Sequence, residues 1–411
     1  MYDIIIIGGG ISGLYTYHSL TKHVPKKNIL LLEKNNYFGG RIYQHTDILF
    51  NHNYSFPAGA ARFNKNHTEV VKLLREFKLI DFRKDKGFTS DFEFIDSKKS
   101  FSTQFNNENG FKYVNKVIKQ SKKFDDNYLK SITFCELAEK VLKKDEVEFM
   151  LIASGYSGQL KHMNSFDAVE LFSKGININM PYWGNKYHLL IESLVDSLKS
   201  KGANLILKAN VENVETNNNT FHIKCNNKIV KCKQIVYCIP KPALLNINQL
   251  KPIHCLLKNS ITCKPLCRTY AIFKKEDIWF HNLKNKVVTN NELRYIIPMD
   301  SENGLIMISY TDDIDTEYWK SIKNNQAKLK TNIVKLVKET FKININKPEK
   351  VYVFHWDCGV TYWNKGYDSD NISNLLINPL PNTFICGENY SKTQSWVEGA
   401  LETSNKCVSL I

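Results

Sequence analysis

A glycine-rich turn between a short apolar run and a helix-like segment constrains this chain more than any other feature. Asp3–Ile7 is a largely apolar run rich in isoleucine, which is typical of a strand buried on both faces. The next residues fit the spacing G-x-G-x-x-G at Gly8, Gly10 and Gly13. In that spacing the glycines permit a tight turn, a close approach of backbone to a pyrophosphate, and close packing of helix on strand. Apolar residues at helical spacing follow over Ile11–Leu20, so we predict a helix whose first turn, with Ser12, faces a phosphate.

An acidic residue follows the second predicted strand. This strand is Asn28–Leu32, and Glu33 comes directly after it, 20 residues beyond Gly13. A carboxylate at this place holds ribose hydroxyls in nucleotide-binding units of this kind. The strand, turn, helix and acid in register therefore predict a Rossmann-type unit that binds a dinucleotide.

Two further glycines and an arginine decide between the candidate dinucleotides. Gly39, Gly40 and Arg41 follow Lys34 after a few residues. They place backbone amides and a guanidinium where these groups clamp the same diphosphate from its far side. The second clamp favours FAD over NAD.

Charge and cysteine patterns narrow the class of protein. The net charge is +15 over 411 residues, but the lysines are spread along the chain among asparagines, so we expect solvated faces and no nucleic-acid surface. No apolar run reaches the ~18 residues of a membrane span, and no secretory signal is recognisable. The ten cysteines are scattered, several of them in apolar runs, as buried free thiols are. We therefore expect no metal site and a reducing, intracellular location in the cytoplasm.

The order of strand-like and helix-like segments predicts two interleaved domains. Residues 67–200 are mainly helical apart from a small β-hairpin expected over Gly87–Phe101, and strands return after Gly202. An amphipathic helix is expected over 320–341. The fold class is mixed α/β (α+β). We predict an FAD-binding domain from residues 1–80, 181–250 and 351–411, and a substrate-binding domain of mixed sheet and helices from residues 81–180 and 251–350.

Three blocks of sequence, in this order and spacing, carry a family resemblance. The first is Asp3–Arg41, and the second combines Val211 with Ile235–Pro240. The third comprises Phe384–Asn389 and Trp396–Ala400. Together they resemble the flavin-containing amine oxidase superfamily, which includes monoamine, polyamine and L-amino-acid oxidases, over nearly the whole chain. The resemblance implies that the second block holds adenine through backbone atoms and that the third lies against the flavin.

The resemblance also implies a set of cofactor-binding residues. Gly387 permits close approach of backbone, and a helix from Val397 aims its N–H dipoles at the part of the flavin that gains negative charge on reduction. Trp356 is expected against the flavin. Cys358 follows it too closely to match the cysteine that attaches FAD in the monoamine branch, so we expect noncovalent FAD. The predicted set is Gly8, Gly10, Ser12, Gly13, Glu33, Lys34, Gly40, Arg41, Ala61, Arg62, Val211, Trp356, Gly387, Glu388 and Val397.

Aromatic side chains and one arginine are the candidates for binding the substrate. Trp396 resembles one wall of the aromatic pair that flanks an amine in this family, and Tyr362 or Trp363 resembles the other. Ordinary core packing is the competing explanation for all three. Arg62, in the stretch Ala58–Phe63, is similar to the arginine that pairs with the substrate carboxylate in L-amino-acid oxidases, and a local ion pair or a contact to FAD fits it equally. We assign His67 to capping or packing.

Arg268 departs from the family pattern. It stands where many members carry a lysine that holds a water molecule near the flavin. An arginine is larger and stays charged, so it orients water or binds a substrate carboxylate instead. We predict Arg268, Trp396 and Tyr362 as the catalytic residues.

The favoured function is FAD-dependent oxidation of the C–N bond of a small-molecule amine or L-amino acid. Hydride passes to the flavin, and O2 reoxidises it with release of hydrogen peroxide. Two alternatives stay open. One is a desaturase or porphyrinogen-oxidase-like enzyme acting on a larger apolar molecule, and the other is a flavin-bound structural or partner-binding protein without turnover.

Overall fold

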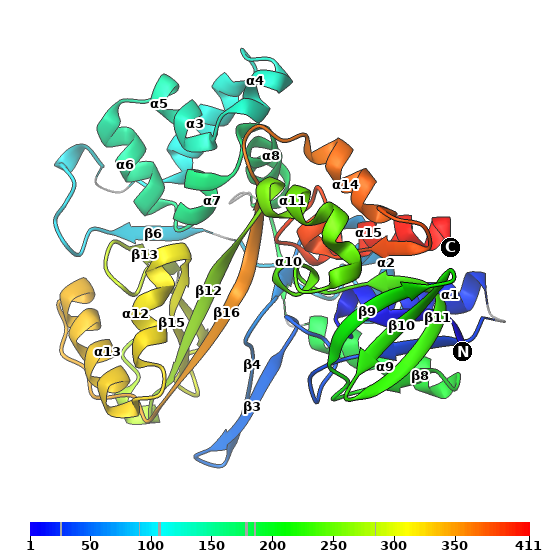
Figure 1. Cartoon of the computed structure of the whole chain (residues 1–411). Coiled ribbons are helices and arrows are strands. Elements are labelled where there is room, and N and C mark those ends of the chain that lie inside the picture. The colour runs from blue at the N-terminus through cyan, green and yellow to red at the C-terminus, as the bar shows by residue number, and fades with distance from the viewer. Residues whose placement is uncertain (25–26, 90, 106–107, 177–179, 185, 284) are drawn as a thin grey trace.

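Two sheets organise the computed structural model, which describes residues 1–24, 27–89, 91–105, 108–176, 180–184, 186–283 and 285–411. Helices cover both sheets, and the mixed α/β class predicted from the sequence is confirmed (Figure 1).

The first sheet contains the predicted strand–turn–helix. β1 (Tyr2–Ile7) pairs in parallel with β2 (Ile29–Leu32) on one side and with β11 (Lys228–Tyr237) on the other. Ile4, Ile5 and Ile6 are fully buried, as a strand covered on both faces requires. The remaining strands of this sheet are β8 (Asn204–Ile206), β9 (Val211–Asn217), β10 (Thr220–Cys225) and β17 (Thr383–Ile385).

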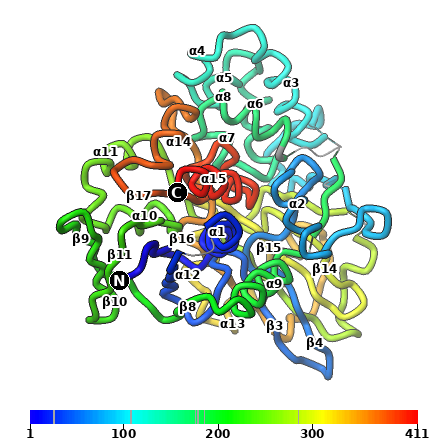
Figure 2. Tube along the Cα trace, turned by 90° about the vertical axis from the view of Figure 1, so that its right-hand side faces the viewer, coloured from blue at the N-terminus to red at the C-terminus, as the bar shows by residue number. Residues whose placement is uncertain are grey.

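The first and last long helices of the chain pack against each other on this sheet. α1 (Ile11–His23) lies between α15 (Val397–Leu410) and α9 (Tyr187–Ser200), as Figure 2 shows. α15 also contacts α2 (Thr68–Glu76) and α14 (Ser369–Ile377). The cofactor loop at the N-terminus is therefore completed by residues near the C-terminus.

The second sheet is built around a long antiparallel pair, β12 (Ile261–Ile272) and β16 (Lys350–Trp363). The sheet continues through β15 (Leu305–Asp312), β14 (Tyr295–Asp300), β13 (Lys286–Thr289) and β6 (Phe92–Ile95). Most of β16 comes from the stretch after residue 350, which the sequence assigns to the cofactor domain.

The region predicted as a β-hairpin over Gly87–Phe101 is instead one edge strand. β6 pairs in parallel with β13, so its partner comes from a segment far along the chain. Alternating Phe92 and Phe94 marked the strand correctly, but alternation alone does not identify the partner. The helix predicted over 320–341 is likewise two helices, α12 (Thr316–Ile322) and α13 (Gln326–Phe341), because the side chain of Asn325 accepts a hydrogen bond from the N–H of Lys328 and caps α13.

Helices form a layer above the β6 edge of the second sheet (Figure 1). They are α3 (Phe111–Ser121), α4 (Asp126–Ser131), α5 (Phe134–Val141), α6 (Lys144–Ala153), α7 (Ser157–His162) and α8 (Ser165–Glu170). Two further helices, α10 (Lys241–Leu244) and α11 (Lys251–Ser260), lie between the last long strand of the first sheet and β12. None of the helices among the described residues is long and apolar enough to span a membrane.

Two small strand pairs carry the chain between the sheets. β3 (Gln44–Leu49) and β4 (His52–Pro57) form a projecting hairpin (Figure 1). β5 (Arg62–Phe63) pairs with β7 (Trp183–Gly184). The loop from Pro57 to Arg62 thus passes from the hairpin into the space between the sheets.

Candidate cofactor and substrate site

The glycine loop adopts the close packing that its spacing predicts. A Cβ added at Gly13 would lie 1.9 Å from the carbonyl oxygen of Gly8, so only glycine lets α1 approach β1 this closely. A Cβ added at Gly10 would meet only one atom, the carbonyl oxygen of Gly39 at 4.0 Å. Ser12 is buried in the first turn of α1. The loop is therefore tight where helix meets strand and open at Gly10, where a diphosphate would approach.

Glu33 lies at the end of β2, as predicted, and its carboxylate is fixed by backbone. One oxygen accepts the N–H of Gly9 at 2.7 Å, and the other accepts the N–H of Asn35 at 2.8 Å. The side chain is buried, yet a carboxylate has further acceptor sites for ribose hydroxyls. Lys34, the next residue, is exposed.

Arg41 and Glu388 join the two ends of the chain in a salt bridge. Gly40 precedes Arg41 and faces the glycine loop, since a Cβ added there would lie 3.4 Å from the Cα of Gly10. Glu388 is buried and also accepts hydrogen bonds from the hydroxyl of Thr361 and the N–H of Ser395. The charge of Arg41 therefore sits beside the loop and is held there by a fully bonded carboxylate.

The C-terminal block meets the glycine loop from the opposite side. Gly387 has φ +146°, a conformation that side chains rarely adopt, and a Cβ added there would lie 3.9 Å from Oγ of Ser12. Val397 is the first residue of α15, and the N–H of Ser395 just before it donates to Glu388, so the start of α15 lies beside the same block. Val211 opens β9 at the far edge of the sheet and is half-buried. Open space at Gly10, a guanidinium and two helix N-termini form a cradle that fits a dinucleotide with an anionic diphosphate.

A separate cluster of aromatic rings surrounds Arg62. Its Nη2 donates to the hydroxyl of Tyr156 at 2.6 Å, and its Cζ lies 4.6 Å from the ring centroid of Tyr182. Tyr182 is stacked on Trp396 with ring centroids 6.3 Å apart. Burial acts to lower the pKa of Arg62, but the phenol groups around it outweigh burial and raise its pKa. Arg62 is thus a charged group fixed among aromatic rings.

Two more tyrosines connect this cluster to Arg268. Tyr295 lies 6.1 Å from Tyr156 and 6.2 Å from Tyr310, measured between ring centroids. The Cζ of Arg268 lies 5.2 Å from the ring centroid of Tyr310. We call Arg62, Arg268 and the tyrosines 156, 182, 295 and 310 the tyrosine cluster. Burial raises the pKa of Tyr310 to about 12, so its hydroxyl stays protonated at neutral pH.

Lys286 on β13 adds a third basic group near the tyrosine cluster. Its ammonium lies 5.0 Å from the ring centroid of Phe88, which packs on Tyr182. Burial and the charge of Arg62 lower the pKa of Lys286 to about 7, against a smaller opposite effect of Asp91. The charge of this site therefore changes near neutral pH.

His67 packs against Trp396, with ring centroids 4.5 Å apart. Both ring nitrogens are buried and have no hydrogen-bond partner among the described residues, and burial together with Arg62 lowers the pKa to about 3. The capping expected of His67 is performed by Glu398, whose carboxylate accepts the N–H groups of Glu69 and Val70 at 2.9 Å. His67 is therefore a neutral packing residue, and Glu398 fixes the start of α2.

Three of the predicted aromatic residues make no ring contact with the tyrosine cluster among the described residues, although Tyr362 and Trp356 pack in the same hydrophobic core as Tyr156 and Tyr295. Tyr362 is fully buried and stacks on His162 next to Asp312. Trp363 is fully buried in the core of the first sheet and donates to the carbonyl of Ser391. Trp356 donates to the carbonyl of Ala58 at 2.9 Å, on the loop that leads to Arg62. Core packing, the competing explanation, describes Tyr362 and Trp363 best, whereas Trp356 borders the loop.

Cys263 and Cys358 form a disulfide between β12 and β16. The expectation that the cysteines are free thiols is therefore wrong for this pair; the other eight are free. The pair was missed because its members are separated by 95 residues and meet only when β12 and β16 pair. The carbonyl of Cys358 accepts a hydrogen bond from Arg41, so the bridge adjoins the cofactor clamp.

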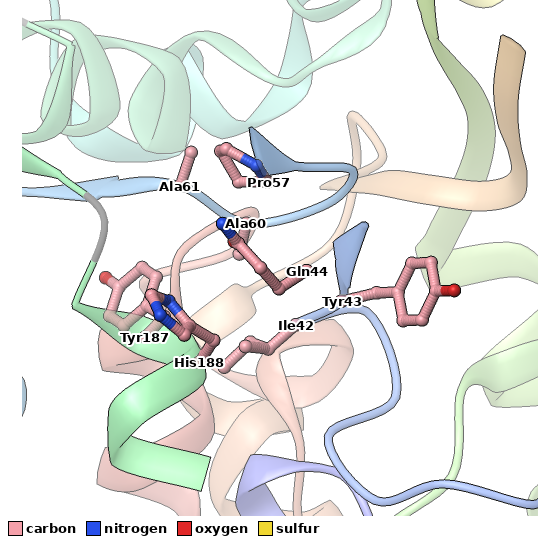
Figure 3. Close-up of a pocket in the computed structure, with 8 residues that line it drawn as sticks. All are labelled: Ile42, Tyr43, Gln44, Pro57, Ala60, Ala61, Tyr187 and His188. Atoms are coloured by element: carbon pink, nitrogen blue, oxygen red, sulfur yellow. The ribbon is translucent and has the colours of Figure 1, made fainter. Parts of the chain in front are cut away.

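A small cavity opens beside the loop that carries Arg62. Figure 3 shows Ala60 between the start of α9 and the chain that enters β3. Its lining residues are Ile42, Tyr43, Gln44, Pro57, Ala60, Ala61, Tyr187 and His188. Its volume is about 10 Å³. Ligand pockets usually measure about 300–1,000 Å³, so we assign no substrate to this space.

Sequence reasoning missed most of the tyrosine cluster. Tyr156, Tyr182, Tyr295 and Tyr310 come from four separate segments and belong to no motif. Tyr295 and Tyr310 lie on β14 and β15, and Tyr156 and Tyr182 lie next to α7 and β7. Only the packing of the helical layer on the second sheet brings them together.

Comparison with solved structures agrees with this fold. A putrescine oxidase, in its wild-type form bound to putrescine, superposes with a TM-score of 0.75 at 13% identity, over 99% of this chain and 98% of the other. The cyclohexylamine oxidase of Brevibacterium oxydans superposes with a TM-score of 0.75 at 15% identity, over 100% and 98%. At such identities the likeness shows a shared fold.

Comparison of sequences assigns the chain to a family. An uncharacterised protein of Acanthamoeba polyphaga mimivirus is 19% identical over 98% of this chain and 92% of its own length. The family model for flavin-containing amine oxidoreductases matches residues 11–411. The protein therefore belongs to the family of flavin-containing amine oxidoreductases, which bind a flavin cofactor.

Proposed function

We propose that the protein binds FAD noncovalently and oxidises the C–N bond of an amine that also carries a carboxylate, an L-amino acid in the simplest case. The observation that carries this proposal is the position of Arg62, held between Tyr156 and Tyr182 beside Trp396. A guanidinium presents paired N–H donors to a carboxylate, and the tyrosine rings leave it charged. When bound, the flavin would accept hydride from the α-carbon and return the electrons to O2, giving hydrogen peroxide.

The chain's own residues would orient the amine and lower its pKa. Arg62 binds the carboxylate, which fixes the neighbouring α-carbon, and the stacked rings of Tyr182 and Trp396 form a flat wall beside it. Arg62, Arg268 and protonated Lys286 put positive charge near the substrate ammonium. Like charges disfavour the protonated amine, so they lower its pKa. The neutral amine, the form that loses hydride readily, is thereby favoured.

Two further observations support noncovalent FAD and a polar substrate over the alternatives. Cys358 is bonded to Cys263, so its sulfur is not free to attach a flavin. A site with two guanidinium groups removed in part from solvent is unfavourable for the large apolar substrate of a desaturase or porphyrinogen-oxidase-like enzyme. A structural protein without turnover would retain flavin that no amine reduces.

The test is an anaerobic screen of the purified yellow protein. Flavin absorbance near its visible maximum is followed while L-amino acids, and the corresponding decarboxylated amines, are added in parallel. We expect bleaching by amino acids and, after an oxygen pulse, recovery of the absorbance with one hydrogen peroxide per turnover. Arg62→Gln should weaken the response to the amino acid about tenfold or more by removing a charge-assisted contact.

The screen also separates the alternatives. Equal bleaching by amino acids and decarboxylated amines, unaffected by Arg62→Gln, would replace the proposal by a simple amine oxidase. Flavin that photoreduces but responds to no amine at all would support the protein without turnover.

A further inference from the structure

Arg268 gives the tyrosine cluster a second fixed guanidinium. It lies on β12, and its Nη1 donates to the carbonyl of Pro57 at 3.2 Å. Its Nε is buried and has no hydrogen-bond partner among the described residues. A guanidinium has five N–H groups and no acceptor, so the bonds to the carbonyl of Pro57 and to the hydroxyl of Tyr270 leave donors for a ligand.

Arg268 and Arg62 belong to one continuous site. Arg268 lies over Tyr310, and the Tyr310–Tyr295–Tyr156 contacts lead to the hydroxyl that receives the hydrogen bond of Arg62. The pKa of Tyr310 responds to both arginines. Arg268 also contacts Pro57, at the beginning of the loop that ends in Arg62. The two guanidinium groups thus adjoin one cluster of tyrosine rings, and they contact or form opposite ends of one loop.

Asp312, two residues from the β15 partner of Arg268, is directed elsewhere. Asp312 accepts the N–H of Gly158 at 3.1 Å, and burial raises its pKa to about 6. Among the ion pairs of the described residues, Asp312 has no cation, and Arg268 has no carboxylate. A half-buried guanidinium without a counter-ion is costly, because part of its hydration is lost without a replacement charge. An anionic ligand would supply the missing partner.

We propose that the substrate carries two anionic groups, with the α-carboxylate on Arg62 and a second acidic group on Arg268, as in a dicarboxylic amino acid. This proposal rests on the proposed function, since it places the second anion in the same site. It assigns to Arg268 the recognition of the substrate side chain. Arg268 stands where many relatives carry a lysine, and in this protein that position would then select the substrate.

The experiment uses the flavin of the holoenzyme as a reporter of binding. Glutarate has two carboxylates and no amine, and glutaramate, its mono-amide, has the same size and one carboxylate. Each compound is titrated into the protein while the flavin absorption spectrum is recorded. We expect glutarate to bind about tenfold more tightly than glutaramate, the usual value of one charge-assisted contact.

Variants test whether Arg268 causes the preference for glutarate. Arg268→Gln should abolish the preference for glutarate and leave glutaramate binding unchanged, and Arg268→Lys should keep part of it because the charge remains. Arg62→Gln should weaken the binding of both compounds. Arg83→Gln removes the same charge from an exposed side chain and serves as the matched control.

Each outcome has one reading. Equal binding of glutarate and glutaramate, with both dependent on Arg62, would overturn the two-anion proposal and leave the proposed function intact. Binding of neither compound would overturn both. The proposal would also be overturned if Arg268→Gln protein lost its FAD while Arg268→Lys protein kept the full preference for glutarate. Arg268 would then be assigned to cofactor binding.

Discussion

At the scale of single residues, charge is the property that gives this site its character. Arg62 and Arg268 are fixed among tyrosines, and His67 is held neutral beside Trp396. Lys286 is the residue whose charge changes in the physiological range, since its pKa is about 7. The site therefore has a permanent positive charge on Arg62 and Arg268 and a charge on Lys286 that changes with pH.

The titration of Lys286 predicts a pH-dependent affinity for carboxylates. Below pH 7 the lysine is charged and adds to the attraction of Arg62, and above pH 7 it is neutral and the attraction falls. Butyrate, which stays anionic throughout, should bind about three- to tenfold more weakly at pH 8 than at pH 6. Flavin-monitored titrations at both pH values measure this difference.

Lys286→Met serves as the control for this pH dependence. Its butyrate affinity should be low and equal at the two pH values. A variant that kept the full wild-type pH dependence would show that another group titrates.

At the scale of secondary-structure elements, the positions of two helices depend on contacts from distant parts of the chain. α2 begins with the backbone N–H groups of Glu69 and Val70 bonded to Glu398 on α15. α1 packs closely on β1 because Gly13 has no side chain. α2 begins beside the tyrosine cluster, and α1 begins beside the diphosphate cradle.

The cap from Glu398 predicts a loss of stability on substitution. Glu398→Ala leaves the buried N–H of Val70 and the half-buried N–H of Glu69 unbonded and should lower the free energy of unfolding by ~1–2 kcal/mol. The shift is measured as the unfolding midpoint in urea. Glu402→Ala, on the same helix but bonded to Thr393, is the matched control and should shift the midpoint less. Equal shifts would argue against a special role for the cap.

The glycine loop predicts a loss of cofactor on a minimal substitution. Gly13→Ala places a methyl group against the carbonyl of Gly8, so α1 must move away from β1 and the cradle widens. We expect FAD affinity to fall about tenfold or more, measured by flavin retained after gel filtration. Gly202→Ala, whose added Cβ meets nothing within 4 Å, should retain its flavin.

Local patterns predicted the elements of the cofactor loop but not the composition of the substrate site. Glu33 and Gly13 act within a unit of neighbouring strands and helices, where spacing along the chain determines spacing in the fold. Tyr156 and Tyr310 meet only through the packing of a helical layer on a sheet, which no short-range pattern encodes. Arg62 and Trp396 were found because each stands in a block that resembles the family. Their roles, and the division into cofactor and substrate domains, stay predictions.

At the scale of the whole molecule, one covalent link joins the two longest strands of the second sheet. Cys263 and Cys358 enclose a loop of 95 residues that contains β13, β14 and β15. A link across a loop of this length restricts the unfolded chain, and links of this kind stabilise proteins by ~2–4 kcal/mol. The disulfide would therefore stabilise the second sheet.

Reduction of this link should therefore lower stability. We expect a lower unfolding midpoint in urea with a reducing agent present, and the same shift in Cys263→Ser protein with or without the agent. Cys255→Ser, at an exposed free cysteine, is the control and should behave as the wild type. Mass spectrometry after alkylation under denaturing, non-reducing conditions reports whether the pair is linked; a wild type that takes up label at Cys263 and Cys358 would contradict the assignment.

The salt bridge between Arg41 and Glu388 has a consequence for the order of events during biosynthesis. The glycine loop leaves the ribosome long before its opposing clamp and the helix that packs on α1, because Glu388 lies 347 residues beyond Arg41. At ~5–20 residues per second, roughly 17–70 s separate the synthesis of the two partners. A nascent chain thus has an open half-site during this interval. We expect tight flavin capture to follow the synthesis of α15, so that a vitamin-starved cell would accumulate colourless protein and convert it later.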